Sequence, residues 1–145
     1  AAHVDVMGWT AGDDKTRAFQ TADVYCLPSY AENLPVSILE AMAARLPVVG
    51  TPVAGTPEEI IEGETGFMIE PGDRPEMAER LVRLLKDPEL RAQMGAAGRL
   101  RAEAHFDNEV VCTRLIGLWR EAIYSRTQET RAKIRPSDYS GGSPA

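Results

Sequence analysis

Cysteine is scarce in this sequence of 145 residues, which contains only Cys26 and Cys112. Neither has a second cysteine or a histidine at the spacing that metal ligands show, so the sequence predicts no metal site. We expect both to be buried free thiols in a reducing compartment.

Long uncharged runs are also absent, and the longest ones are too short to span a bilayer as a helix. Residues 1–9 lack the basic start and the apolar core of a secretory signal. These absences favour a cytoplasmic location.

Positive charge is in deficit, with 16 Lys and Arg against 22 Asp and Glu, a net charge of −6 and a pI near 5.0. A domain that binds nucleic acid presents a basic face, so the sequence excludes nucleic acid as a partner. The remaining composition is that of a soluble globular protein. Its length predicts one folded domain over residues 1–127. From residue 128 the sequence is polar, which predicts a disordered tail over 128–145.

The central feature of the sequence is one βαβ unit. An apolar segment over residues 24–27 is followed by a short loop that carries Glu32. A helix begins near Pro35 and carries Glu40, and a second apolar segment spans residues 46–49. Such a unit implies parallel strands with a right-handed crossover. Its loop lies at the carboxyl end of the first strand, where α/β sheets bind ligands.

The start of this helix has the chemistry of a phosphate site. Proline suits a first helical position, and the N–H groups of Asn33, Leu34 and Val36 then point outward from a positive helix end. Ser37 adds a hydroxyl, although it is equally a plain residue of the first turn.

Glu32 and Glu40 are the candidate sugar ligands. A carboxylate accepts two hydrogen bonds side by side, which suits the vicinal hydroxyls of a ribose or a hexose. With the phosphate site between them, the two carboxylates meet the needs of a sugar nucleotide. The alternative is that Glu32 is a solvated loop acid and Glu40 a solvated helix acid.

The remaining segments complete an α/β pattern. Strands are predicted at residues 3–7 and 67–69, and helices at residues 13–21, 57–62, 74–86, 88–104 and 108–126. Asp73, Asp87 and Asp107 are the expected N-cap residues of the last three helices. Gly95 and Gly98 weaken the helix that contains them and permit close packing.

These motifs together resemble the donor-binding half of the family-4 retaining glycosyltransferases of the GT-B fold. The resemblance covers roughly residues 4–119. It is carried by six ordered segments: Ala22-Asp23-Val24 with Leu27-Pro28-Ser29, Glu32 followed after seven residues by Glu40-Ala41-Met42-Ala43, Pro47-Val48-Val49, Gly55-Thr56-Pro57-Glu58, Thr65-Gly66-Phe67 and Pro71-Gly72-Asp73.

The resemblance implies specific roles. Glu32 contacts the transferred sugar, Glu40 the ribose hydroxyls, and Gly8 and Trp9 lie against the base of the donor. No metal and no cofactor are implied, because the nucleotide-diphosphate sugar is itself the substrate. The implied reaction is the transfer of a hexose with retention to an unknown acceptor, as part of carbohydrate biosynthesis. The implied location is the cytoplasm, or the inner face of the membrane for a longer enzyme.

The resemblance also implies an incomplete domain. A whole donor domain has six parallel strands, whereas this sequence predicts about four, a partial Rossmann-like sheet with flanking helices. Strands one and two, the basic residues for the diphosphate and the N-terminal acceptor domain are not found in it. We therefore expect the chain to be inactive alone. Its exposed strand edges predict either collapse of the first strand onto the second or pairing of two copies into a homodimer.

Three residues depart from the family pattern. Pro35 has no N–H, so one donor to the phosphates is lost. Arg45 and Ala54 stand where glycine is common, and a left-handed backbone at Arg45 would cost about 1 kcal/mol. Two other functions stay open: a non-catalytic nucleotide-binding or scaffold module derived from a GT-B domain, and an epimerase that acts on a sugar nucleotide.

Overall fold

The structure, a computed structural model, describes residues 4–133, with side chains described as far as residue 126. The chain divides into two compact units, Ala1–Phe106 and Asp107–Ala145. The boundary between them falls inside the single domain expected over residues 1–127.

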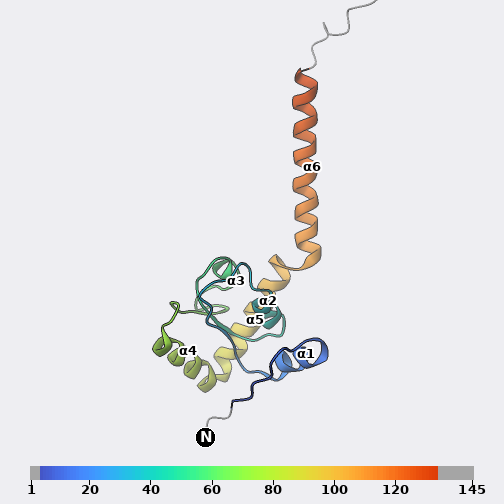
Figure 1. The fold of residues 1–145 in the computed structure, drawn as a ribbon. Helices are drawn as coiled ribbons and strands as arrows, with labels where there is room; N and C mark the ends of the chain where they lie inside the picture. The colour runs from blue at the N-terminus through green and yellow to red at the C-terminus, as the bar shows by residue number, and fades with distance from the viewer. Residues whose placement is uncertain (1–3, 134–145) are drawn as a thin grey trace, which may run out of the picture. The chain divides into compact units, whose positions relative to one another are not determined.

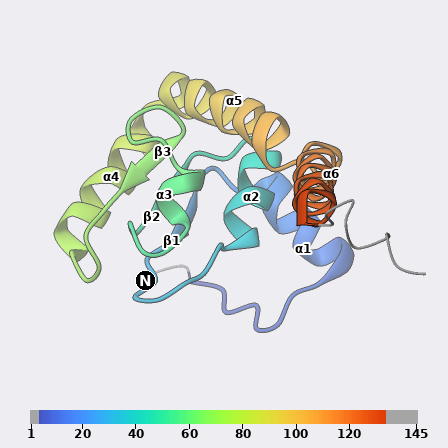
Figure 2. The same cartoon turned by 90° about the horizontal axis from the view of Figure 1, so that it is seen from above.

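The first unit is built on a parallel sheet of three strands in the order β1-β2-β3 (Figures 1 and 2). These strands are β1 (Tyr25–Leu27), β2 (Val48–Gly50) and β3 (Gly66–Met68). Tyr25 lies opposite Val48, and Val48 lies opposite Gly66. The α/β class, the parallel sheet and three of the four expected strands are confirmed.

The strand expected at residues 3–7 is wrong for the part that the structure describes. Residues 4–7 form no strand, and Val4, Val6 and Met7 are 74%, 91% and 62% exposed. An extended segment becomes a strand only when a neighbour satisfies its backbone groups. No neighbour pairs with this segment, and β1 pairs only with β2, so the collapse of the first strand onto the second is not observed. Pairing between two copies stays a prediction.

Five helices surround the sheet: α1 (Gly12–Thr21), α2 (Val36–Ala43), α3 (Thr56–Glu59), α4 (Arg74–Lys86) and α5 (Pro88–His105). The Asp73 and Asp87 carboxylates accept hydrogen bonds from the N–H groups of Glu76 and Leu90, both at 2.9 Å, so the two N-caps are confirmed. The helix expected over residues 57–62 is shorter, because Ile60 is already extended.

Two apolar cores lie on opposite faces of the sheet, because Val48 and Val49 are consecutive in β2 and point to opposite sides. Val48 packs with Ile38 and Met42 of α2, whereas Val49 packs with Leu84 of α4 and Met94 of α5. Figure 2 shows α2 and α4 on either side of the strands.

Helix α5 links the other helices through three arginines. Arg99 donates to the carbonyl of Ala43 at the end of α2, and Arg101 donates to the carbonyls of Glu58 and Glu59 at the end of α3. Arg91 donates to the carbonyls of Leu84 and Leu85 near the end of α4. The last carbonyls of a helix have no partner within the helix and carry partial negative charge, so each guanidinium stabilises the end that it contacts.

The backbones of α5 and of Arg45, the second residue after α2, are almost in contact. A Cβ atom built on Gly95 would lie 2.0 Å from the carbonyl oxygen of Arg45, and one built on Gly98 would lie 3.5 Å from Cγ of Met42. The expectation that these glycines permit close packing is confirmed.

Arg45 adopts the left-handed backbone expected for it, with φ 64°, and Ala54 also has a positive φ of 46°. We predict that Arg45→Gly raises the free energy of unfolding by about 1 kcal/mol, since glycine adopts this conformation without a Cβ clash. Urea unfolding followed by circular dichroism measures the change. Arg45→Ala is the matched control, because it removes the side chain but keeps Cβ, and an equal gain in both variants would contradict the prediction.

The second unit contains α6 (Asn108–Lys133). The Asp107 carboxylate accepts a hydrogen bond from the N–H of Glu109 at 2.8 Å, close to the cap expected there. Helix α6 continues past residue 128, so the start of the expected tail is helical, and residues 134–145 lie outside the described part. Among the described residues no helix has the length and apolar character needed to cross a membrane.

The two cysteines differ in environment. Cys26 in β1 is half-buried, and burial raises the pKa of its thiol. Cys112 in α6 is exposed, so the expectation of a buried thiol there is wrong. The same helix exposes several large apolar side chains, among them Leu118, Trp119 and Ile123.

Candidate functional site

Glu32 lies in the loop that leaves the carboxyl end of β1. It is half-buried, and its Oε1 accepts a hydrogen bond from the Ser29 hydroxyl at 2.7 Å. The carbonyl of Ser29 accepts in turn from the hydroxyl of Thr51, at 2.6 Å, just beyond the end of β2. The Glu32 carboxylate is therefore oriented by a chain of contacts that reaches the next strand.

The loop is also held at a second point. Gly55 donates its N–H to the carbonyl of Asn33 at 2.7 Å, and a Cβ on Gly55 would lie 2.6 Å from that same oxygen. The backbones approach each other so closely that only glycine fits. The loops after β1 and β2 thus form one rigid edge above the carboxyl ends of the strands.

Helix α2 begins directly after this edge, as the sequence indicates. Pro35 occupies the N-cap position, one residue before the helix, and makes no side-chain cap. Among the described residues, no hydrogen bond is donated by the N–H groups of Asn33, Leu34 or Val36. These three N–H groups therefore have no acceptor among the described residues. Val36 is the first residue of α2, at the positive end of the helix, and Asn33 and Leu34 come just before it.

Ser37 faces the sheet. The phenol of Tyr25 has a pKa raised by burial, while a hydrogen bond with the Ser37 hydroxyl acts in the opposite direction. This contact gives Ser37 a partner within the fold, in addition to its expected place near the phosphates.

Glu40 projects from α2 and contacts a residue that the sequence analysis did not single out. The Lys15 ammonium of α1 lies 2.6 Å from Oε1 of Glu40 in an ion pair that is partly exposed on both sides. The 25 residues between the two give no local signal for this pair. In this structure the carboxylate expected to hold the ribose is bound to an ammonium.

Gly8 and Trp9 lie on the same side of the molecule as that pair. They line a cavity of about 410 Å³ together with Lys15, Phe19 and Tyr25. Lys15 and Phe19 also line a second cavity, of about 290 Å³, whose wall includes Glu40. Lys15 therefore connects the residues expected to contact the base with the residue expected to contact the ribose.

Glu59 is the second residue that sequence reasoning missed. It is fully buried at the end of α3, and neither carboxylate oxygen has a hydrogen-bond partner. Burial, followed by the charges of Glu32 and Glu58, raises the pKa of its carboxyl group to about 7. A signal was present, because Thr56 lies three residues before Glu59, on the same face of a helical turn, and is also buried.

The site therefore has two distinct parts. One holds Glu32 and the three free N–H groups, and the other holds Glu40, Lys15, Gly8 and Trp9, with α2 running between them. One carboxylate lies before α2 and the other within it, and a helix start favours an anion, so the arrangement has the chemistry to hold a diphosphate that joins two polyhydroxylated rings. Among the described residues no cluster of three acidic, histidine or cysteine side chains could hold a metal ion.

Comparison with known families gives a match to the model described as "Glycosyl transferases group 1", over residues 1–101. Curated relatives include the sulfoquinovosyl transferase of Arabidopsis thaliana, 39% identical over 101 residues, which cover 68% of this chain and 20% of the relative. The N-acetyl-alpha-D-glucosaminyl L-malate synthase of Bacillus anthracis is 35% identical over 111 residues, 77% of this chain and 29% of the relative. The chain thus spans less than a third of the length of either relative.

Solved structures share the fold. The sucrose-phosphate synthase of Thermosynechococcus elongatus superimposes with a TM-score of 0.70 at 31% identity, over 74% of this chain and 27% of that one. HepE of Anabaena, solved in complex with UDP-glucose, gives a TM-score of 0.70 at 22% identity, over 76% of this chain and 30% of that one. The architecture is therefore that of the GT-B glycosyltransferases.

Proposed function

Because the chain belongs to the glycosyl transferases group 1 family, we propose that it is the donor-binding part of a longer retaining glycosyltransferase. The donor is a nucleoside diphosphate sugar, and the acceptor is held by a domain outside this chain. The observation that carries the proposal is that Glu32 precedes the start of α2 and Glu40 lies within α2, while the N–H groups between them have no acceptor among the described residues.

Glu40 is proposed to bind the ribose hydroxyls. It projects into the cavity that adjoins Gly8 and Trp9, where the base would lie. The Lys15 ammonium contacts only Oε1 of this carboxylate, and a ribose that takes both oxygens would weaken or displace that contact. Partly exposed ion pairs are worth about 1 kcal/mol or less, so this exchange costs little.

The diphosphate is proposed to lie at the start of α2. The N–H groups of Asn33, Leu34 and Val36 donate to its oxygens, and the positive helix end stabilises the charge that grows as the diphosphate leaves. Pro35 supplies no donor, so this chain offers one N–H fewer than the family pattern. The basic residues that complete the phosphate site in the family have no counterpart here, which is why we propose that the chain is inactive alone.

Glu32 is proposed to orient the transferred sugar. Its carboxylate is fixed by Ser29, so it contributes position more than proton transfer while the sugar carbon develops oxocarbenium character. Retention of configuration follows the family. The expected cytoplasmic location, with contact to the inner membrane face for a longer enzyme, and the homodimer both remain predictions.

The proposal is tested by calorimetric titration of the chain with UDP, GDP and ADP. We expect one nucleotide to bind, and we expect Glu40→Ala to weaken it about tenfold or more, because hydrogen bonds to a charged group are worth about 1.5–3 kcal/mol. Glu103→Ala is the matched control, since it removes a carboxylate from an ion pair on α5 instead. Equal affinities for the wild type and Glu40→Ala, or no binding of any nucleotide at millimolar concentration, would contradict the proposal.

A further inference from the structure

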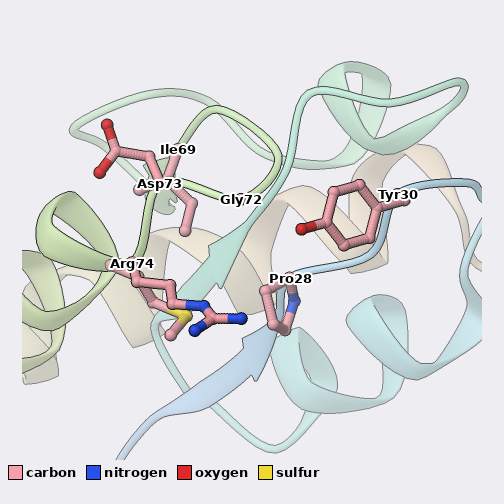
Figure 3. Close-up of a pocket in the computed structure, with 7 residues that line it drawn as sticks. Pro28, Tyr30, Ile69, Gly72, Asp73 and Arg74 are labelled. Carbon is pink, nitrogen blue, oxygen red and sulfur yellow. The ribbon is translucent and has the colours of Figure 1, made fainter.

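A separate cavity of about 180 Å³ lies at the carboxyl edge of the sheet. Pro28 and Tyr30 reach it from the loop after β1, Ile69 and Gly72 from the turn after β3, and Arg74 and Met77 from the start of α4. Three segments that are distant in the sequence thus meet around one hollow (Figure 3). We call it the Tyr30–Arg74 pocket.

The pocket wall depends on a glycine. Gly72 has a φ of 89°, and a Cβ built on it would lie 3.0 Å from the Tyr30 hydroxyl oxygen. A side chain at position 72 would therefore be strained and would also press on the hydroxyl. The absence of a side chain leaves room for the phenol to reach over the hollow.

Two hydrogen-bond donors of the pocket have no protein acceptor. Among the described residues, neither the Tyr30 hydroxyl nor the Arg74 guanidinium makes a hydrogen bond or an ion pair. Figure 3 shows the guanidinium extending toward Pro28 and the phenol oxygen pointing inward from the other side. Both groups therefore face the hollow with their donors available.

Asp73, the acidic residue in the pocket wall, uses its carboxylate to cap α4. The Asp73 carboxylate accepts the N–H of Glu76 as the N-cap of α4, and in Figure 3 it points away from Arg74 and Tyr30. The positive end of this 13-residue helix also lies at the pocket. The Arg74 guanidinium is therefore the charged side-chain group that faces the hollow.

The size and chemistry of the pocket define its ligand. Sites for drug-sized molecules enclose roughly 300–1,000 Å³, so this pocket accepts one group and not a whole nucleotide. A guanidinium binds phosphate oxygens through two parallel hydrogen bonds, and a phenol adds a third. Pro28, Ile69 and Met77 form the apolar part of the pocket wall.

We propose that the Tyr30–Arg74 pocket binds a phosphate group. Tyr30 is two residues before Glu32 in the same loop, so the bound group would lie close to the proposed sugar position. Its source is either the donor diphosphate or a phosphate carried by the acceptor. The existence of the pocket does not depend on the proposed function, whereas the choice between these two sources does.

The test is an NMR titration of the chain with inorganic phosphate at constant ionic strength. We expect saturable shifts of the Tyr30, Gly72 and Arg74 amides, an affinity about tenfold lower in Arg74→Gln, and one about threefold lower in Tyr30→Phe. Lys86→Gln is the matched control, because it removes one charge at the other end of α4. Shifts that do not saturate, or equal affinities of Arg74→Gln and Lys86→Gln, would overturn the proposal.

A second titration separates the two sources. The nucleotide that binds in the calorimetric titration is added to the wild type and to Arg74→Gln, with and without saturating phosphate. An apparent dissociation constant that rises with phosphate in the wild type but not in Arg74→Gln assigns the pocket to the donor diphosphate. A constant that phosphate changes equally in both chains, or in neither, assigns the pocket to a phosphate of the acceptor. Failure of UDP, GDP and ADP alike to bind while phosphate still saturates the pocket would contradict the proposed function and leave the phosphate site standing.

Discussion

Glu59→Gln is expected to remove a pH dependence of folding. Between pH 4.5 and pH 7 the free energy of unfolding of the wild type falls by about 3 kcal/mol, and that of the variant does not. The carboxyl group has a pKa of about 7 in the folded chain against 4.5 in an exposed state. Each unit of that difference corresponds to about 1.4 kcal/mol. The size follows from the complete burial of the side chain, whose oxygens have no partner.

The direction follows from which state releases its proton first. As the pH rises above 4.5, the unfolded chain ionises Glu59 while the folded chain keeps it neutral, so unfolding becomes more favourable. Below pH 4.5 both states are protonated and the penalty is absent. Above pH 7 both are ionised and the penalty is constant. The Glu32 and Glu58 carboxylates add to burial in raising this pKa. Arg101 donates to main-chain carbonyls of α3, including that of Glu59 itself.

Urea unfolding at pH 5, 6, 7 and 8 measures this effect. At each pH, the difference in free energy of unfolding between the wild type and Glu59→Gln isolates the contribution of the Glu59 carboxyl group from those of the other titrating groups. Glu64→Gln is the matched control, because this carboxylate is exposed in the turn that follows α3 and is not among the charges that raise the pKa of Glu59. If wild type and Glu59→Gln lose stability in parallel over this pH range, Glu59 is not a buried acid.

Gly95→Ala is expected to lower the free energy of unfolding by about 3 kcal/mol. The new methyl group would lie 2.0 Å from the carbonyl oxygen of Arg45, far inside contact distance. Overpacking costs about 1–3 kcal/mol, and more when the obstacle is backbone that cannot rotate away. The better helix propensity of alanine returns about 1 kcal/mol, so the clash dominates.

Gly98→Ala provides the comparison within the same helix. Its new methyl group would lie 3.5 Å from Met42, which is an ordinary contact with a flexible side chain. We expect it to be neutral or to stabilise the chain by up to about 1 kcal/mol. Urea unfolding measures the free energy of unfolding of the two variants. An equal change in both would show that α2 and α5 are not packed backbone to backbone.

Local chemistry explains what the sequence predicted well. Asp73 and Asp87 cap their helices because a carboxylate accepts from an N–H three residues later, and this depends on neighbours in the chain alone. The loop of Glu32 and the start of α2 likewise follow from the spacing of apolar segments around Pro35. The left-handed backbone of Arg45 could be expected from its position after a helix.

Contacts between distant residues explain what was missed. Residues 4–7 alternate like a strand, yet pairing depends on a partner that local pattern cannot supply. Lys15 reaches Glu40 across 25 residues, and Arg91, Arg99 and Arg101 reach the ends of three helices. In sequence these are ordinary surface charges. Glu59 was missed because an acid in a short helix is usually solvated.

The exposure of the two tryptophans determines which events tryptophan fluorescence can report. Trp9 is 96% exposed and Trp119 is 60% exposed, so both indoles already meet water in the folded chain. Their fluorescence will therefore change little when the core unfolds. Trp9 instead lines the cavity next to Lys15 and Phe19, where an arriving base would stack or quench. Trp119→Phe would leave Trp9 as the single tryptophan, so the fluorescence of the chain would report ligand binding directly.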